Sequence, residues 1–333
     1  MIQKRKKERD VMIVCAGEAL IDMVETKNDN YNCFIPKPGG SPYNTAVAVA
    51  RAGGSAGYFG AIAEDCFGKQ LIGRLKADNV SLRFVKQCSE PSTLAFVQTQ
   101  NGEPNYSFYV TGTSMMVFDP ARALALTHEL SAGSCIVFGS ISLVLEPVGT
   151  MYEALMQEFA SRQNRPIIAF DPNIRSHLIR NKTDYLKRFE KFVEHVDIVK
   201  VSQADLEFLM PDISFEKALE IIAGKGALLV VGTRGVHGAA AVKRDDSGRL
   251  LYCEVPGRSV QVADTVGAGD TFHGALLAVL EQKGKLTKEA LLTMDNDELT
   301  EVLNFANCAS ALVCTRYGAE PPTLDEITAL LPQ

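Results

Sequence analysis

One segment of the chain combines glycines with a carboxylate in a way that suits chemistry on a phosphate group. It reads Asp264-Thr265-Val266-Gly267-Ala268-Gly269-Asp270-Thr271-Phe272 and continues into an apolar stretch over 272–280. Glycine lets the backbone turn sharply and approach a ligand closely. If a helix opens at Ala268 or Gly269, its free amides can bind a phosphate or a developing anion. Asp270 beside such amides could take a proton from an alcohol, which favours phosphoryl transfer to a hydroxyl. Asp-Thr is also a common helix N-cap, so these residues alone leave a structural role open.

A second glycine-rich segment precedes a predicted helix near the N-terminus. It reads Pro38-Gly39-Gly40-Ser41-Pro42-Tyr43-Asn44. A Gly-Gly turn lets the backbone approach a polar ligand, and the Asn44 amide can both donate and accept hydrogen bonds. An ordinary loop and helix start explains the same residues, so both interpretations stay open.

Short apolar runs alternate with amphipathic stretches along the chain and predict the elements that position these residues. The predicted buried strands are 12–16, 135–138, 167–170, 198–201 and 228–231. The predicted intervening helices are 44–52, 151–162, 184–195 and 215–223. Such alternation indicates an α/β fold with a doubly wound, mostly parallel sheet and helices on both faces. Ligands of these sheets bind beyond the carboxyl ends of the strands, where we expect the polar residues to converge.

Two regions break this pattern. Residues 22–34 and 94–110 alternate apolar and polar side chains, as antiparallel strands do. We expect them to form a small sheet inserted into the α/β domain. One face of such a sheet needs covering, by a substrate or by a second subunit.

Composition narrows the class of protein. The chain has 333 residues, 46% of them hydrophobic, with a net charge of −6. This suits one large domain, predicted over 12–331, and argues against a nucleic-acid partner. Eight cysteines without a Cys-x-x-Cys pair indicate reduced thiols, with no structural zinc site. Residues 1–11 are interpreted as a basic, disordered tail, and we expect a cytoplasmic protein without a membrane partner.

The two glycine-rich segments together resemble the two signatures of the PfkB/ribokinase family of sugar kinases. The 264–272 segment is similar to the C-terminal signature, and Gly53, Gly60 and Gly68 continue the N-terminal one. The resemblance extends over nearly the whole chain. It implies a ribokinase-like fold with a β-sheet lid, ATP as co-substrate and Mg²⁺ as cofactor. It also implies that Asp270 is the base and that the amides of Gly267, Ala268 and Gly269 stabilise the developing charge.

The resemblance further implies sugar contacts. Gly17-Glu18-Ala19-Leu20-Ile21-Asp22 is similar to the family's opening motif, whose aspartate binds sugar hydroxyls. Asp171-Pro172-Asn173-Ile174-Arg175 looks like the version in fructokinases and 2-keto-3-deoxygluconate kinases, and Arg175 can offer a planar fork to an oxygen. The predicted sugar-binding residues are Asp22, Gly39, Gly40, Asn44, Tyr109 and Arg175.

Other positions match nucleotide and cation contacts of the family. The predicted ATP-binding residues are Asn173, Ser202, Asp205, Thr233, Gly235 and Asn307. Ser202 and Asp205 stand where the family has Asn-x-x-Glu, and a plain helix cap explains them equally well. The residues expected around a monovalent cation, with K⁺ the candidate, are Asp264, Val266, Val313, Arg316 and Gly318.

Fructose is the substrate expected first, because the segments Gly39–Asn44 and Asp171–Arg175 resemble the fructokinase versions of the family's motifs. A 2-keto-3-deoxygluconate kinase, a ribokinase-type activity and a non-catalytic sugar-binding regulator remain alternatives. A dinucleotide oxidoreductase is disfavoured, because the first strand is not followed by its glycine-rich turn. In many members of the family two lids pack into a homodimer; here Tyr106, Phe108 and Phe34 are expected at the contact, while Asp22 and Tyr109 face the sugar.

Overall fold

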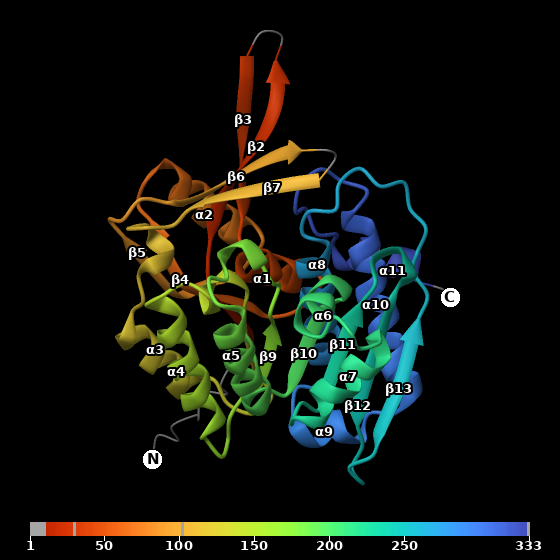
Figure 1. Ribbon diagram of the computed structural model, residues 1–333. Helices are drawn as coiled ribbons and strands as arrows, with labels where there is room; N and C mark the ends of the chain where they lie inside the picture. The colour runs from red at the N-terminus through yellow and green to blue at the C-terminus, as the bar shows by residue number, and fades with distance from the viewer. Residues whose placement is uncertain (1–10, 29–30, 101–102, 332–333) are drawn as a thin grey trace, which may run out of the picture.

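A computed structural model of the chain describes residues 11–28, 31–100 and 103–331 (Figure 1). Residues 1–10 of the predicted tail lie outside this range. Within the described residues the larger sheet has nine strands in the order β13-β12-β11-β10-β9-β8-β1-β4-β5. The strands from β11 to β5 pair in parallel, and β12 and β13 continue the sheet antiparallel. Their bounds are β1 Ile13–Ala16, β4 Ala56–Ala63, β5 Ser81–Cys88, β8 Cys135–Gly139, β9 Ile167–Asp171, β10 Ile198–Ser202, β11 Leu229–Thr233, β12 Ala239–Arg244 and β13 Leu250–Val255.

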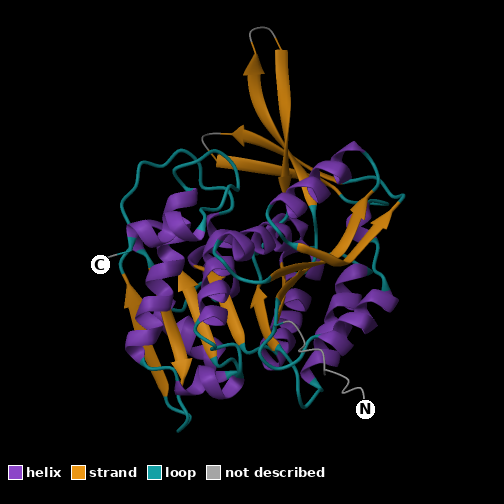
Figure 2. Cartoon of the chain, turned by 180° about the vertical axis from the view of Figure 1, so that it is seen from behind, coloured by secondary structure: helices purple, strands orange, loops and turns teal. Residues whose placement is uncertain are grey.

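Helices cover both faces of this sheet, because both faces of its central strands are apolar (Figure 2). In β1, for example, Ile13 and Cys15 pack on one face, and Val14 and Ala16 pack on the other. One face carries α1 Ser41–Arg51, α2 Cys66–Ala77, α8 Ala268–Gln282, α9 Lys288–Thr293, α10 Asn296–Val313 and α11 Leu324–Leu330. The other carries α3 Pro120–Glu129, α4 Val148–Ala160, α5 Lys182–His195, α6 Gln203–Leu209 and α7 Phe215–Gly224. The predicted doubly wound fold is confirmed.

The second sheet is the lid that stands above the larger one in Figure 1. Its order is β3-β2-β6-β7, with bounds β2 Leu20–Asn28, β3 Tyr31–Gly39, β6 Thr93–Gln100 and β7 Glu103–Tyr109. Each hairpin is antiparallel, and β2 and β6 join the two hairpins in parallel. The inserted strands were therefore predicted correctly. The first hairpin extends beyond its predicted end, because Gly39 pairs with Leu20 where β2 begins.

Strand order places a ligand site beside β1. The chain passes from β1 to β4 on one side, and β8 later joins β1 on the other side. A crevice opens at such a switch point, outside the carboxyl ends of the strands. Glu18 follows β1 there, and Ser140 follows β8. Among the described helices, none is long and apolar enough to span a bilayer.

Candidate active site

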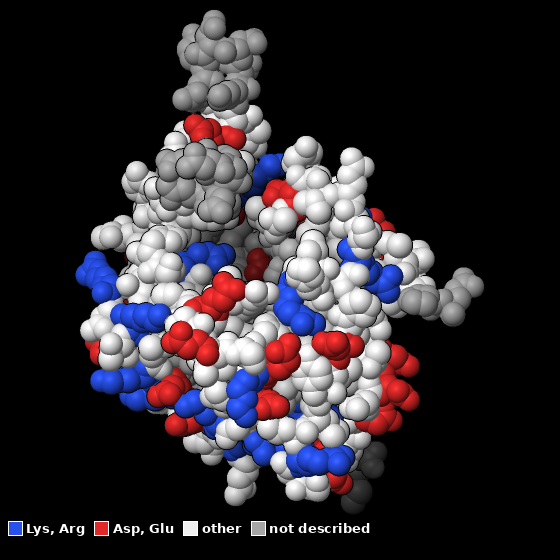
Figure 3. All heavy atoms as spheres, turned by 45° about the vertical axis from the view of Figure 1, so that its right-hand side comes forward, with Lys and Arg blue, Asp and Glu red and all other residues white. Residues whose placement is uncertain are grey.

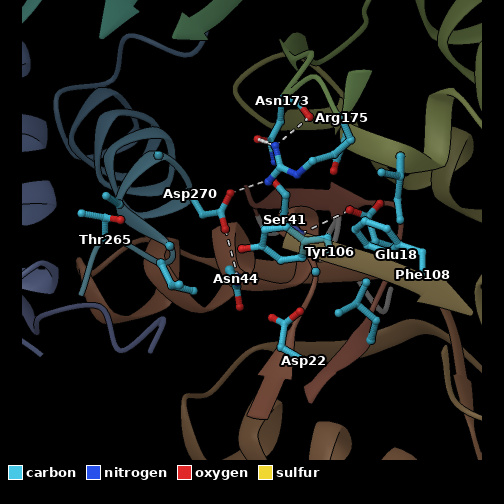
Figure 4. A pocket seen from close by; sticks show the side chains of 18 residues that line it. Glu18, Asp22, Ser41, Asn44, Tyr106, Phe108, Asn173, Arg175, Thr265 and Asp270 are labelled. Carbon is cyan, nitrogen blue, oxygen red and sulfur yellow. Dashed lines mark hydrogen bonds between the residues drawn. The ribbon is translucent and has the colours of Figure 1, made fainter. Parts of the chain in front are cut away.

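A cavity of about 260 Å³ lies between the lid and the carboxyl ends of the central strands. It is visible as a hollow below the lid, with acidic atoms at depth and Lys or Arg atoms near its rim (Figure 3). The lid contributes Asp22, Tyr106 and Phe108 to its lining, while α1 and α8 contribute Ser41 and Asp270 (Figure 4). Small-molecule sites combine such concave shape with a few convergent polar groups.

Asp270 lies in the first turn of α8, and its position depends on the turn before it. Gly267 caps the helix with φ 76°, a left-handed conformation that a side chain would strain. A Cβ on Gly267 would also collide with Ala319. Asp270 Oδ1 accepts a hydrogen bond from Ser41 Oγ at 2.6 Å, and Oδ2 accepts one from Asn44 Nδ2 at 3.0 Å. Two polar side chains of α1 therefore orient the carboxylate of α8.

The electrostatic surroundings suit a base beside an anion. Burial raises the pKa of Asp270 above its usual value, against the lowering effect of the Ser41 and Asn44 hydrogen bonds. The amides of Gly267 and Gly269 donate to no acceptor within the described part of the chain. The Ala268 amide donates to the Thr265 carbonyl at 3.2 Å, so it would have to leave this bond to contact a ligand. The turn can thus offer two amides to an anion without rearrangement.

Glu18 is a cavity residue that sequence analysis did not select. Its side chain is buried, accepts a hydrogen bond from the Ser41 amide at 3.3 Å and contacts Ser142 Oγ. Burial raises its pKa. It therefore fixes the start of α1, on which Ser41 and Asn44 lie. Its place directly after Gly17 at the end of β1 is the signal that could have pointed to it.

Asp22 projects from β2 into the same cavity. Burial raises its pKa to about 7, and the nearby Asp270 carboxylate adds to this, while Arg175 opposes it. Gly39 makes room for it on the paired strand, because a Cβ there would collide with the Asp22 carboxylate. Four of the six predicted sugar contacts line this cavity together: Asp22, Gly40, Asn44 and Arg175.

Tyr109 does not join them, and its predicted orientation is wrong. The Tyr109 residue is 62% exposed and its ring contacts Phe96. Neighbouring residues of a strand point to opposite faces, so Phe108 and Tyr106 face the cavity instead. Tyr106 and Phe108 therefore line the cavity, and their place at a subunit contact stays a prediction. The alternation of side chains along β7 separates Tyr106 and Phe108 from Tyr109, but it does not show which of the two sets faces the cavity.

Asn173 and Arg175 form one unit at the rim. Arg175 Nη1 donates to Asn173 Oδ1 at 2.7 Å, and its guanidinium lies 5.9 Å from the centre of the Tyr106 ring. Asn173 has φ 38°, and its amide donates to Asp171 Oδ1 at 3.1 Å. Both residues line the cavity. Asn173, which was predicted to bind ATP, therefore lies in the same cavity as the predicted sugar contacts and the glycine turn at 267–269.

The other predicted nucleotide residues lie outside the cavity lining. Ser202 and Asp205 form a capping box on α6, and Asp205 Oδ1 also accepts from the Ile174 amide at 2.7 Å. Thr233 pairs with Ser202 at the adjacent strand end, and Gly235 follows it. Asn307 is buried and donates to the Pro256 carbonyl at 2.7 Å. Ser202, Asp205 and Asn307 thus have structural tasks.

The residues expected around a monovalent cation come from two adjacent segments. Asp264 connects them, because Oδ1 accepts from the Val266 amide at 3.1 Å and Oδ2 from the Gly318 amide at 2.8 Å. The Arg316 amide donates to the Val313 carbonyl at 3.0 Å. Carbonyl and carboxylate oxygens of this kind suit a hard cation. Among the described residues no group of three or more His, Cys, Asp or Glu could hold a metal ion.

A buried carboxylate beside free helix amides, in a cavity closed by a β-sheet lid, defines a class of phosphotransferases that use a hydroxyl acceptor. The profile of the pfkB family carbohydrate kinases matches residues 10–326. The chain belongs to this family, and it is a carbohydrate kinase.

Similar proteins agree with this assignment. The fructokinase of Rhizobium leguminosarum bv. trifolii is 38% identical over 290 residues, which cover 86% of this chain and 85% of that protein. Fructokinase-1 of Oryza sativa subsp. japonica is 32% identical and covers 97% of both chains. The crystal structure of a fructokinase from Xylella fastidiosa with bound ATP has a TM-score of 0.82 at 27% identity, covering 96% of this chain and 97% of that one.

Proposed function

We propose that this kinase transfers the γ-phosphate of ATP to a hydroxyl of fructose. The observation that carries the proposal is the contact of Asp270 with Ser41 and Asn44 at the base of a lidded cavity. Relatives at 38% and 32% identity are named fructokinases, which supports fructose over other sugars.

The residues suggest how the transfer proceeds. Asp22, Asn44 and Arg175 orient the sugar hydroxyls, and Asp270 accepts the proton of the reacting hydroxyl. That oxygen attacks the γ-phosphorus, the bond to the β-phosphate oxygen breaks, and ADP leaves with the electron pair. The amides of Gly267 and Gly269 stabilise the charge that develops on the transferred group. Tyr106 and Phe108 on the lid exclude water, which would otherwise compete as the acceptor.

Mg²⁺ fits this site as an ion bound by the ATP phosphates and by water, rather than as an ion coordinated directly by protein side chains. Both carboxylate oxygens of Asp205 already accept hydrogen bonds, and Ser202 caps the same helix. These two residues would act through metal-bound water. When bound, the ion neutralises charge on the phosphates. The ATP base is proposed to lie toward Thr233, Gly235 and Asn307.

Further properties complete the proposal. K⁺ would bind the carbonyls of Val266, Val313, Arg316 and Gly318 beside Asp264. Residues 12–331 would form one kinase domain with the lid strands inserted. Two copies would associate through their lids. The protein would be cytosolic, a compartment that suits the buried thiols of Cys15 and Cys135.

A coupled assay of ADP formation tests the substrate. Fructose, 2-keto-3-deoxygluconate, ribose and nucleosides would be compared at saturating MgATP. The proposal expects the highest kcat/KM with fructose. A higher value with another acceptor would reassign the substrate, and sugar binding without ADP formation from any acceptor would indicate a non-catalytic regulator.

A further inference from the structure

A buried ion pair lies behind the base of the cavity. Lys200 of β10 donates from Nζ to Asp171 Oδ2 at 3.0 Å, and both residues are almost fully buried. Burial opposes the charge of Lys200, but Asp171 and Asp205 outweigh it and raise the pKa of the ammonium. Lys200 is therefore a cation inside the protein, and its ammonium has three N–H groups for one acceptor among the described residues.

The Lys200 ammonium lies against the anion-binding turn. A Cβ on Gly269 would be 3.0 Å from Lys200 Nζ, so the glycine leaves the space that the ammonium occupies. Since Gly269 is the second residue of α8, this positive charge lies beside the first turn of the helix, next to residues that line the cavity. It adds to the positive end of the helix dipole at this point.

His273, one turn further along α8, does not supply a second cation. Its side chain is buried, and burial together with Lys200 lowers its pKa to about 3. Its Nδ1 lies 3.9 Å from Asp171 Oδ2, and neither ring nitrogen has a hydrogen-bond partner among the residues that the structure describes. The imidazole is therefore uncharged at neutral pH.

We propose that Lys200 is a positioning residue for phosphoryl transfer, whose buried ammonium supports the Gly267–Gly269 turn from behind and keeps the Asp270 carboxylate charged. This rests on the proposed role of Asp270 as the base. Asp171 acts in the opposite direction: it anchors Lys200, but its own negative charge disfavours the ionised form of Asp270. The pair thus sets the charge state of the base from the protein side.

The effect of Lys200 and Asp171 on Asp270 can be separated from the effects of the other ionisable groups nearby. Ionisable groups face Asp270 from several elements: Cys15 of β1, Asp22 of β2, Tyr106 of β7, Asp171 of β9 and Lys200 of β10. Arg175 lines the same cavity. Asp22, Tyr106 and Arg175 lie on the substrate side, so bound sugar covers them. Lys200 and Asp171 stay out of contact with the substrate.

The pH profile of kcat at saturating sugar and MgATP tests the proposal. In Lys200→Met the acid limb should move to higher pH by about one unit, because Asp270 loses a stabilising cation. We expect kcat at neutral pH to fall roughly tenfold or more. In Asp171→Asn the acid limb should move to lower pH. The series is repeated in an Asp22→Asn background, which removes a second cavity carboxyl, whose own pKa is raised to about 7 and whose titration could be mistaken for that of Asp270.

Lys243 provides a matched control. It is also fully buried, but its Nζ donates to the Leu292 carbonyl at 2.8 Å, behind α9. Lys243→Met should leave the acid limb in place, whatever it does to stability. If the acid limb of Lys200→Met coincides with that of the wild type, the proposal is overturned. If Lys200→Met does not fold, Asp171→Asn decides, and an unmoved limb there also overturns it. Absence of sugar phosphorylation by the wild type would instead refute the proposed function.

Discussion

Three carboxylates line one cavity, and their surroundings give them different tasks. Glu18 is bound by the Ser41 amide and by Ser142, so it serves the backbone at the start of α1. Asp270 is held by two side chains of α1 and lies beside free amides. Asp22 lies on the lid, and burial raises its pKa to about 7. Differences of this kind separate an orienting carboxylate from a base.

The base assignment predicts the effect of Asp270→Asn. The change keeps the shape of the side chain and removes the proton acceptor, so kcat should fall by ~10²–10⁴. ATP binding should persist, which isothermal titration calorimetry would measure. Near wild-type turnover in this variant would refute the assignment.

The raised pKa of Asp22 predicts how sugar affinity depends on pH. Above a pKa of about 7 the carboxylate is ionised and accepts hydrogen bonds from sugar hydroxyls; below it the protonated form is a weaker acceptor. The KM for sugar should therefore fall as the pH rises through 7. Asp22→Asn should raise KM and flatten the profile. A pH dependence that survives in Asp22→Asn would have another origin.

At the scale of elements, close packing of α1 on α8 brings Asn44 to Asp270. Gly274 permits this approach: a Cβ there would lie 2.6 Å from Ala48 Cβ and 2.8 Å from the Thr45 carbonyl oxygen. Ser41 and Asn44, which contact Asp270, lie in the first turn of α1, and Asp270 lies in the first turn of α8. The helix pair is thus the rigid base of the site, and the lid strands are the wall that closes it.

The lid strand β7 allows a matched pair of substitutions. Tyr106 lines the cavity and stacks on Phe108 at 5.8 Å, whereas Tyr109 is exposed on the other face. Tyr106→Ala should raise the KM for sugar about tenfold, equivalent to ~1.4 kcal/mol. Tyr109→Ala removes the same ring from the same strand and should leave KM within about twofold. Equal effects of the two changes would contradict the described orientation of β7.

At the scale of the whole molecule, the predicted cation links the end of α10 to the phosphate turn. An ion on the Val313 and Val266 carbonyls would order the segment that leads into Gly267. Activity should therefore rise when K⁺ replaces tetramethylammonium at equal ionic strength. Rates that do not differ between the two salts would argue against the site.

The projecting hairpin β2–β3 predicts association of two copies. Val24 and Ile35 pair directly across it, with 38% and 46% of their surface exposed. Exposed apolar pairs on a projecting hairpin suit a subunit contact. Sedimentation at micromolar concentration should show a dimer, and Ile35→Asp should shift it to monomer. Leu124→Asp, which alters a 58% exposed apolar residue of α3, should not. A wild-type monomer with full activity would refute association through the lid.

Sequence alone determined the alternation of helices with the strands β1, β8, β9, β10 and β11, the inserted lid and the glycine turn before Asp270, but it did not select β4, β5, β12 or β13. These features follow from local periodicity and from residues with special backbone freedom, which act over a few positions. The start of α5 shows the limit: it lies at Lys182, ahead of the predicted 184, because the Asn181 side chain caps the helix by accepting from the Thr183 and Asp184 amides.

Only the tertiary structure decided which side chains meet. Asn44 and Asp270 are 226 positions apart in sequence, and Gly274 lets their helices pack closely enough for contact. Tyr106 faces the cavity and Tyr109 does not, because a strand's alternation gives two faces without saying which one is inside. Lys200 could not be singled out in an ordinary strand, since its proposed role depends on Gly269, a residue of another element that has no side chain where the ammonium lies. Long-range packing sets such contacts, and no local pattern carries that information.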